Sequence, residues 1–180
     1  MKGSRRLVID ASVASAAGGV EATHPTSKSC RDFLQAVLSI CHRAVFPPQL
    51  SKEWKKHASL FSQTWQVAME RRQKLDWIEP DTDDEIRETI AETAASEKDK
   101  AAMEKDVFLL EAAQATTDRM VASLDEIVRG LFRELASQLP RIEKSVWINP
   151  AREEDSFYRR SIAGSRSGWR PRSARPRPVR

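Results

Sequence analysis

Short apolar runs alternate with longer helical stretches along most of the chain, and this alternation constrains the fold more than any other feature. We expect four strands, at residues 6–10, 43–46, 119–123 and 145–148. A fifth, minor strand is expected at residues 75–78. Helical periodicity fills the intervals between them. Strands joined by helices run parallel and are covered on both faces. The sequence therefore predicts an α/β fold around a parallel sheet of four or five strands.

Hydroxyl side chains and charge patterns indicate where the helices lie. Thr26 or Ser27 is expected to cap the first long helix. Ser51 is expected to cap the second, which continues as one or two helices to about residue 74. A further helical stretch covers residues 82–116, and its first part, residues 83–105, is so highly charged that we expect it to be exposed.

The chain has 180 residues, a length typical of one domain, which we place at residues 1–150. Residues 156–180 contain eight Arg and no acid, so the net charge of +4 leaves −4 for residues 1–155. The basic character therefore belongs to an Arg-, Pro- and Ser-rich tail at residues 151–180, which we expect to be disordered. The domain itself does not have the composition of a basic nucleic-acid binder.

Several classes of protein are excluded by simple patterns. No apolar stretch reaches the roughly 18 residues of a membrane span, and we find no signal peptide. The two cysteines, Cys30 and Cys41, are expected to be buried thiols on one helix face, which fits a cytoplasmic location. No His-x-x-x-His or Cys-x-x-Cys spacing predicts zinc, and no Gly-rich phosphate loop is present.

Four acids occupy positions that a parallel sheet would bring together. Asp10 and Asp125 follow expected strands, whereas Glu53 and Asp106 open buried helical stretches. The carboxyl ends of parallel strands share one edge, where ligands bind. Clustered carboxylates repel one another and need a cation or bound protons, and hard ions such as Mg²⁺ or Mn²⁺ prefer carboxylate oxygens. Such ions can activate water for phosphodiester cleavage. Each acid is also compatible with a plain role as a helix cap or a first-turn residue.

The motifs around these acids resemble those of the PIN-domain ribonucleases. Leu7-Val8-Ile9-Asp10-Ala11-Ser12 is similar to the opening of that family, and Asp106-x-x-Leu-Leu-x-Ala-Ala and Met120-Val121-Ala122-Ser123-Leu124-Asp125 are similar to later motifs. The resemblance covers roughly residues 6–149. It implies a three-layer α/β/α sandwich and a metal-dependent endoribonuclease with Mg²⁺ or Mn²⁺ as its cofactor. The implied catalytic and metal-binding residues are Asp10, Glu53, Asp106 and Asp125. Ser12 and Ser123 would hydrogen-bond a carboxylate, a metal-bound water or a phosphate.

The resemblance also implies partners. RNA is the expected substrate, many relatives are toxins held by a cognate antitoxin protein, and a homodimer is expected by analogy. The long charged stretch at residues 81–105 and the extended helical region at residues 51–74 depart from the compact toxin pattern, so a free-standing nuclease is as credible. Asp118 and Glu126 are alternatives for the fourth acid. We favour Asp125 because Asp118 precedes its strand and belongs at the opposite edge.

Three lysines surround one of the acids. Lys52, Lys55 and Lys56 are placed to guide an RNA backbone toward Glu53. Two other interpretations of the chain stay open: a catalytically weak PIN-like module that binds RNA or protein, and an unrelated α/β protein whose acids are helix caps. A nuclease requires the four acids to converge, whereas a binding module tolerates them dispersed or paired with cations.

Overall fold

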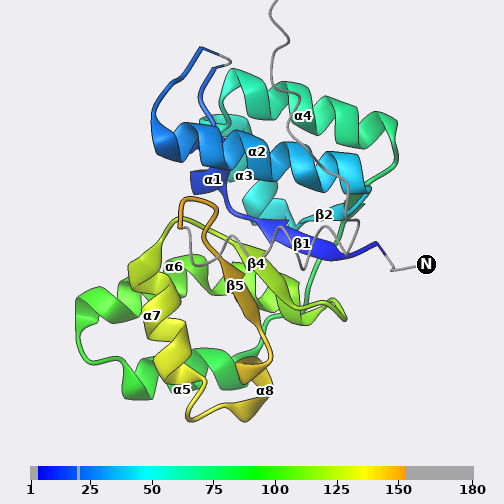
Figure 1. Ribbon diagram of the computed structural model, residues 1–180. Helices are drawn as coiled ribbons and strands as arrows, with labels where there is room; N and C mark the ends of the chain where they lie inside the picture. The colour runs from blue at the N-terminus through cyan, green and yellow to red at the C-terminus, as the bar shows by residue number, and fades with distance from the viewer. Residues whose placement is uncertain (1–3, 20, 153–180) are drawn as a thin grey trace, which may run out of the picture.

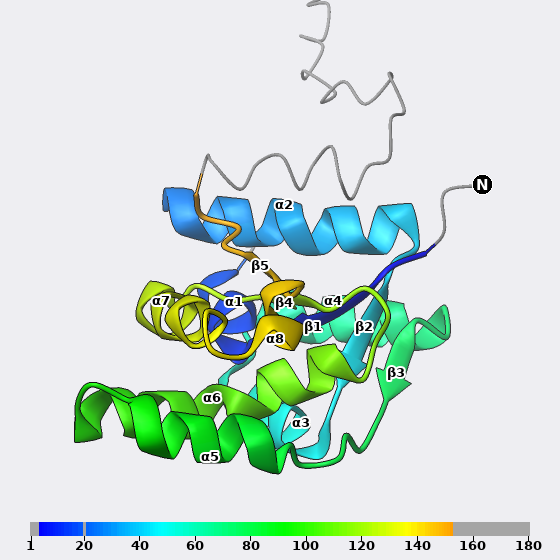
Figure 2. The same cartoon turned by 90° about the horizontal axis from the view of Figure 1, so that it is seen from below.

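The central sheet is parallel throughout in the computed structural model, which describes residues 4–19 and 21–152 (Figure 1). In these residues the strand order is β3-β2-β1-β4-β5, and Figure 2 shows β5 and β3 at the two ends. The strands are β1 (Arg6–Ile9), β2 (Arg43–Phe46), β3 (Leu75–Trp77), β4 (Met120–Ala122) and β5 (Val146–Ile148). All five fall within the runs expected from the sequence. Most of the expected tail, residues 153–180, lies outside the described residues.

Helices cover both faces of the sheet, so the fold is a three-layer α/β/α sandwich (Figure 1). The helices on one face are α1 (Ala11–Ala16), α2 (Pro25–Ile40), α3 (Pro48–His57) and α4 (Leu60–Arg71). Those on the other face are α5 (Asp84–Thr93), α6 (Glu97–Gln114), α7 (Glu126–Leu135) and α8 (Pro140–Glu143). Right-handed crossovers explain this division, because the chain steps outward from β1 to β3 and then returns to β4 on the other side of β1.

Two helices begin earlier than the hydroxyl side chains suggested. His24 caps α2, because its ring nitrogen accepts from the Thr26 amide at 3.3 Å, and Pro25 follows as the first helical residue. Helix α3 likewise begins at Pro48, and the Ser51 hydroxyl donates to the Pro47 carbonyl instead of capping the helix. Proline suits the first turn, since it has no amide to leave unpaired. The expectations for Thr26, Ser27 and Ser51 as caps were therefore wrong.

The highly charged stretch forms two helices and contributes to a core, contrary to the exposure expected for residues 83–105. Ile86 and Ile90 of α5 and Met103 of α6 are buried. They pack with apolar residues of α7 and α8 into a second core cluster beside the one around the sheet. The spacing of the buried residues follows helical periodicity, so one narrow apolar face is enough to bury these helices despite their charge.

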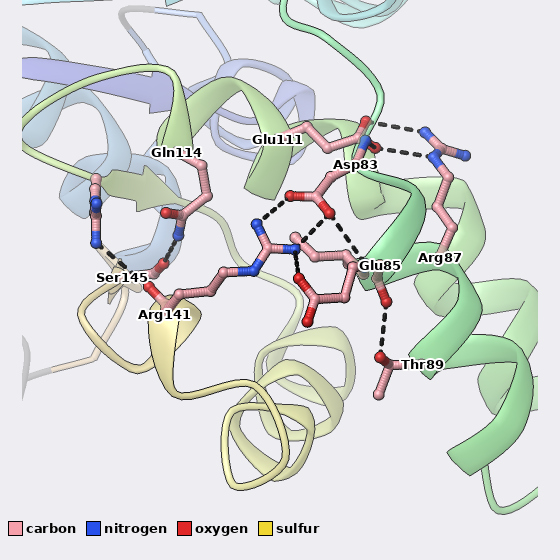
Figure 3. A network of polar contacts seen from close by, with 10 residues as sticks. Asp83, Glu85, Arg87, Thr89, Glu111, Gln114, Arg141 and Ser145 are labelled. Carbon is pink, nitrogen blue, oxygen red and sulfur yellow. Dashed lines mark hydrogen bonds and ion pairs between the residues drawn. The ribbon is translucent and has the colours of Figure 1, made fainter.

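Helix α5 is also fastened by ion pairs (Figure 3). The Glu111 carboxylate on α6 is buried, accepts from Arg87 Nε at 2.8 Å and Nη2 at 2.9 Å, and accepts from the Asp83 amide at 2.9 Å. Arg141 of α8 pairs with Asp83 and, at 2.8 Å, with Glu85. Arginine therefore joins α5 to α6 by a buried contact and to α8 by a more exposed one.

The two cysteines differ in their surroundings. Cys30 is buried as expected, and this burial raises the pKa of its thiol to about 11. Cys41 is exposed, so the expectation of a second buried thiol was wrong. The chain leaves α2 at Cys41 with a φ of 64°, which turns this residue away from the buried face of the helix. Over the described ranges, the structure contains no helix with the length and apolar character needed to cross a membrane.

Candidate functional site

Asp10 lies at the point where the strand order of the sheet reverses, between β1 and β4. The chain leaves β1 for β2 on one side, whereas β4, the other neighbour of β1, leads away to β5. In open parallel sheets this switch point forms a crevice at the carboxyl ends of the strands. Asp10 directly follows β1, and its amide donates to the Ala122 carbonyl of β4 at 2.9 Å. The expected strand-end position of Asp10 is therefore confirmed.

Two serines hold the Asp10 carboxylate. Ser123 Oγ donates to Asp10 Oδ2 at 2.9 Å, and Ser12 Oγ donates to the same oxygen. Each hydroxyl also accepts a backbone amide after β4: Ser12 from Leu124 at 3.2 Å, and Ser123 from Asp125 at 3.1 Å. The two serines thus fix the carboxylate and tie the end of β1 to the loop after β4. Their expected hydrogen bonding to a carboxylate is confirmed.

Asp125 caps the helix that follows β4. Its Oδ1 accepts from the Val128 amide at 2.9 Å, and the residue is exposed. A capping carboxylate faces the positive end of the helix dipole, which stabilises its charged form. The capping role expected from the sequence leaves the second carboxylate oxygen available to a ligand.

Glu53 reaches the same edge from the middle of α3. The buried indole of Trp54 donates to the Ile9 carbonyl at 2.8 Å, and this bond fixes α3 against the last residue of β1. Trp54 directly follows Glu53 in the sequence, and Ile9 directly precedes Asp10, so this bond brings the two acids toward the same edge. Burial raises the pKa of Glu53, the Asp10 charge raises it further, and Lys105 and His57 oppose both effects.

Asp106 is the most buried of the four acids, and its pKa is raised by the charges of the other three. It lies within α6, and burial is the main reason that its pKa rises to about 6. Lys105, whose Nζ lies 3.9 Å from Asp106 Oδ1, lowers that pKa, and the charges of Asp10, Asp125 and Glu53 each raise it. The other three carboxylates therefore lie close enough to Asp106 for their negative charges to act on it, and Asp10 acts in the same way on Glu53.

The donor set suits a hard cation in its chemistry but does not form a closed cage. Within residues 4–19 and 21–152, no three Asp, Glu, His or Cys side chains are placed to hold one metal ion together. Mg²⁺ commonly uses only one or two protein carboxylates and keeps several waters or substrate oxygens. Mutually repelling carboxylates at a crevice fit a hydrated ion of that kind.

The two alternative acids are engaged elsewhere. Asp118 Oδ2 accepts from the Arg6 amide at 2.9 Å, which places Asp118 at the start of β1, at the opposite edge. Glu126 accepts from Asn149 Nδ2 at 2.7 Å and pairs with Arg129 at 3.4 Å and Arg152 at 3.3 Å. Their surroundings favour Asp125 as the fourth member of the cluster.

Exposed cations lie beside the acids. Lys52, Lys55 and Lys56 are all exposed on α3, around Glu53 as the sequence suggested. Sequence reasoning missed Lys105 and the bond from Trp54 to Ile9. A lysine directly before Asp106 was a visible signal for the first of these, whereas only the packing of α3 against β1 reveals the second.

The comparison with protein-family models gives no match, and neither does the comparison with curated protein sequences.

Proposed function

We propose that the chain is a Mg²⁺- or Mn²⁺-dependent, PIN-like endoribonuclease that hydrolyses RNA phosphodiester bonds at the acidic edge. The observation that carries the proposal is the convergence of Asp10, Glu53 and Asp125 on Asp106, whose pKa responds to all three. A buried carboxylate with like charges around it is costly unless a cation or bound protons offset the charge. Its position at the switch point of a parallel sheet, where ligands bind in such folds, supports a catalytic purpose.

The residues divide the work according to their surroundings. Asp10 is held in one orientation by two hydroxyls, so it is the fixed ligand of the group. Asp106 retains its proton up to about pH 6 and must release it before it can bind a cation. Lys52, Lys55 and Lys56 attract the phosphate backbone toward the edge. A bound divalent ion would supply an activated water and offset the negative charge that develops at phosphorus.

Cleavage of a mixed RNA pool by the full chain tests the proposal. We expect cutting with Mg²⁺ or Mn²⁺, none with EDTA, and a loss of at least about a hundredfold in Asp10→Asn. Asp118→Asn is the matched control, because it removes the same charge at the opposite edge of the sheet. Absence of cutting by folded protein with every metal, or equal loss in both variants, contradicts the proposal.

A second candidate is a catalytically weak PIN-like module that binds RNA or protein. The absence, among the described residues, of any three side chains placed to hold one ion favours it. Titration of the full chain with Mn²⁺ separates the two candidates. A nuclease binds the ion through Asp10 and loses that binding in Asp10→Asn, whereas a binding module shows no such difference.

The remaining expectations concern partners and location. A cognate antitoxin and a homodimer stay predictions of the PIN resemblance, and a cytoplasmic location stays a prediction from the two cysteines. Purification of the chain with its cellular partners tests the first, and light scattering tests the second. A free-standing enzyme is expected to cut RNA alone, while a toxin is expected to be silenced by a co-purifying protein.

A further inference from the structure

A groove lies between α7, α8 and β5, and its lining runs from Arg129, one turn into α7, to Ser145, which precedes β5 at the opposite edge of the sheet from the acids. It has a volume of about 590 Å³, and its lining includes Arg129, Phe132, Arg133 and Trp147. One acid, Glu143, also lines it. The groove borders α7, the helix that Asp125 caps at its N-terminus.

The two arginines of the groove, Arg129 and Arg133, follow Asp125 along α7. Arg129 and Arg133 lie four residues apart on one face of α7, and Arg129 lies four residues after Asp125, which caps this helix. Each interval advances about 6 Å along the helix axis. Arg129 is partly buried and pairs with Glu126 at 3.4 Å, whereas Arg133 is exposed. The guanidinium groups therefore extend as a row that leads away from the acidic edge.

An aromatic surface lies beside this row. The Phe132 and Trp147 rings are stacked, with centroids 5.5 Å apart and planes inclined by 23°. Phe132 is the buried member of this pair, and Trp147 is partly exposed and lines the groove. A supported indole next to cations is the combination by which proteins bind single-stranded nucleic acid, since each base can stack and each phosphate can pair.

We propose that this groove binds a single-stranded segment of RNA that leads away from the acidic edge, with Arg129 and Arg133 on phosphates and Trp147 stacked on a base. The choice of RNA as the occupant rests on the proposed function. Two positive side chains suit a polyanion, and the row begins one helical turn from Asp125. The groove thus extends the substrate path from the acidic edge along α7.

Fluorescence anisotropy with a short labelled single-stranded RNA of mixed sequence tests the inference. The full chain carries Asp10→Asn and is kept in EDTA, so that no RNA is cut during the measurement. Adding Arg129→Gln and Arg133→Gln should weaken binding about tenfold and reduce the slope of log affinity against log salt by about 1.4. Arg71→Gln with Lys74→Gln is the matched control, since it removes two charges near β3, at the other end of the sheet. The control should change affinity less than about twofold.

Two further measurements keep the test independent of folding and of catalysis. Arg133→Gln alone changes only an exposed residue and should weaken binding in the same direction. Crosslinking with 5-iodouridine RNA should modify the peptide that contains Trp147. Unchanged affinity in the double variant, with crosslinks elsewhere, overturns the inference, even if the wild type cleaves RNA. The same result is expected if the groove binds a protein instead. Lost affinity without any cleavage supports the groove and rejects the nuclease.

Discussion

Asp106 shows how the fold sets the chemistry of a single residue. A carboxyl on the surface has a pKa near 3.8, and burial together with three acidic neighbours raises the pKa of Asp106 to about 6. Between these two pH values the folded chain holds more protons than the unfolded chain. The free energy of unfolding therefore falls as pH rises through this interval, and it stays lowered above it.

Replacement of Asp106 removes this cost. In EDTA at pH 7.5 we expect Asp106→Asn to raise the free energy of unfolding by on the order of 3 kcal/mol, with the gain shrinking toward zero near pH 4. Urea denaturation across this pH range measures the effect. Asp32→Asn, at an exposed position on α2, reports the effect of removing one negative charge from the surface. A gain that is the same at every pH would contradict the assignment of the cost to ionisation.

The serines that hold Asp10 provide a second test at the same scale. Ser123→Ala and Ser12→Ala each remove a donor from the Asp10 carboxylate and loosen its orientation. Supporting hydrogen bonds of this kind typically contribute ten- to a hundredfold to activity, so we expect at least a tenfold loss of RNA cleavage in each variant. Kinetics with saturating Mg²⁺ measures it. Ser39→Ala, at an exposed position of α2, should cleave at the wild-type rate.

The strand-end acids were predictable from the sequence, but their supporting contacts were only partly so. Asp10 and Asp125 follow apolar runs, and a parallel sheet places such residues at one edge. The serine contacts were expected as one of several roles. The Trp54 indole on the Ile9 carbonyl was not, because that bond depends on how α3 is oriented against β1.

At the scale of elements, arginine contacts decide how firmly α5 is attached. Glu111 is almost fully buried, so loss of its partner leaves a charge without compensation. The contact of Arg141 with Asp83 and Glu85 is more exposed, and water screens it. The two arginines in Figure 3 therefore offer a buried and an exposed version of the same interaction.

We expect Arg87→Met to lower the free energy of unfolding by about 3 kcal/mol, and Arg141→Met by about 1 kcal/mol or less. Adding Glu111→Gln to Arg87→Met should recover much of the larger loss, because the amide carries no charge and can still accept from the Asp83 amide. Urea denaturation at pH 7 measures all three. Equal losses for the two arginines would show that burial of Glu111 does not govern the contact.

Element positions were easier to predict than element burial. The five strands followed from short apolar runs, but residues 83–105, which form α5 and the start of α6, were expected to be exposed because their charged residues outnumber their apolar ones. Ile86, Ile90 and Met103 nonetheless form a continuous apolar face once α7 packs against it. Composition averages over all sides of a helix, whereas burial depends on one side alone.

At the scale of the whole molecule, negative charge gathers at the acidic edge and positive charge at the end of the sequence. Residues 1–155 carry −4, and residues 156–180 carry eight arginines without an acid. A cluster of carboxylates repels an RNA backbone, so binding requires cations elsewhere in the chain. The three lysines of α3 and the groove arginines supply some of them, and the eight terminal arginines supply more.

Replacement of those eight arginines by glutamine changes the net charge from +4 to −4. We expect RNA affinity in the full chain to fall by at least about tenfold and its dependence on salt to weaken. Binding with fewer phosphate contacts releases fewer counterions from the RNA. Anisotropy at several salt concentrations measures both quantities in the Asp10→Asn background. Replacement by eight lysines is the control: charge alone predicts retained affinity, while stacking by guanidinium groups predicts a loss. Equal affinity and equal salt dependence in the glutamine variant would show that RNA reaches the acidic edge through the cations of the domain alone.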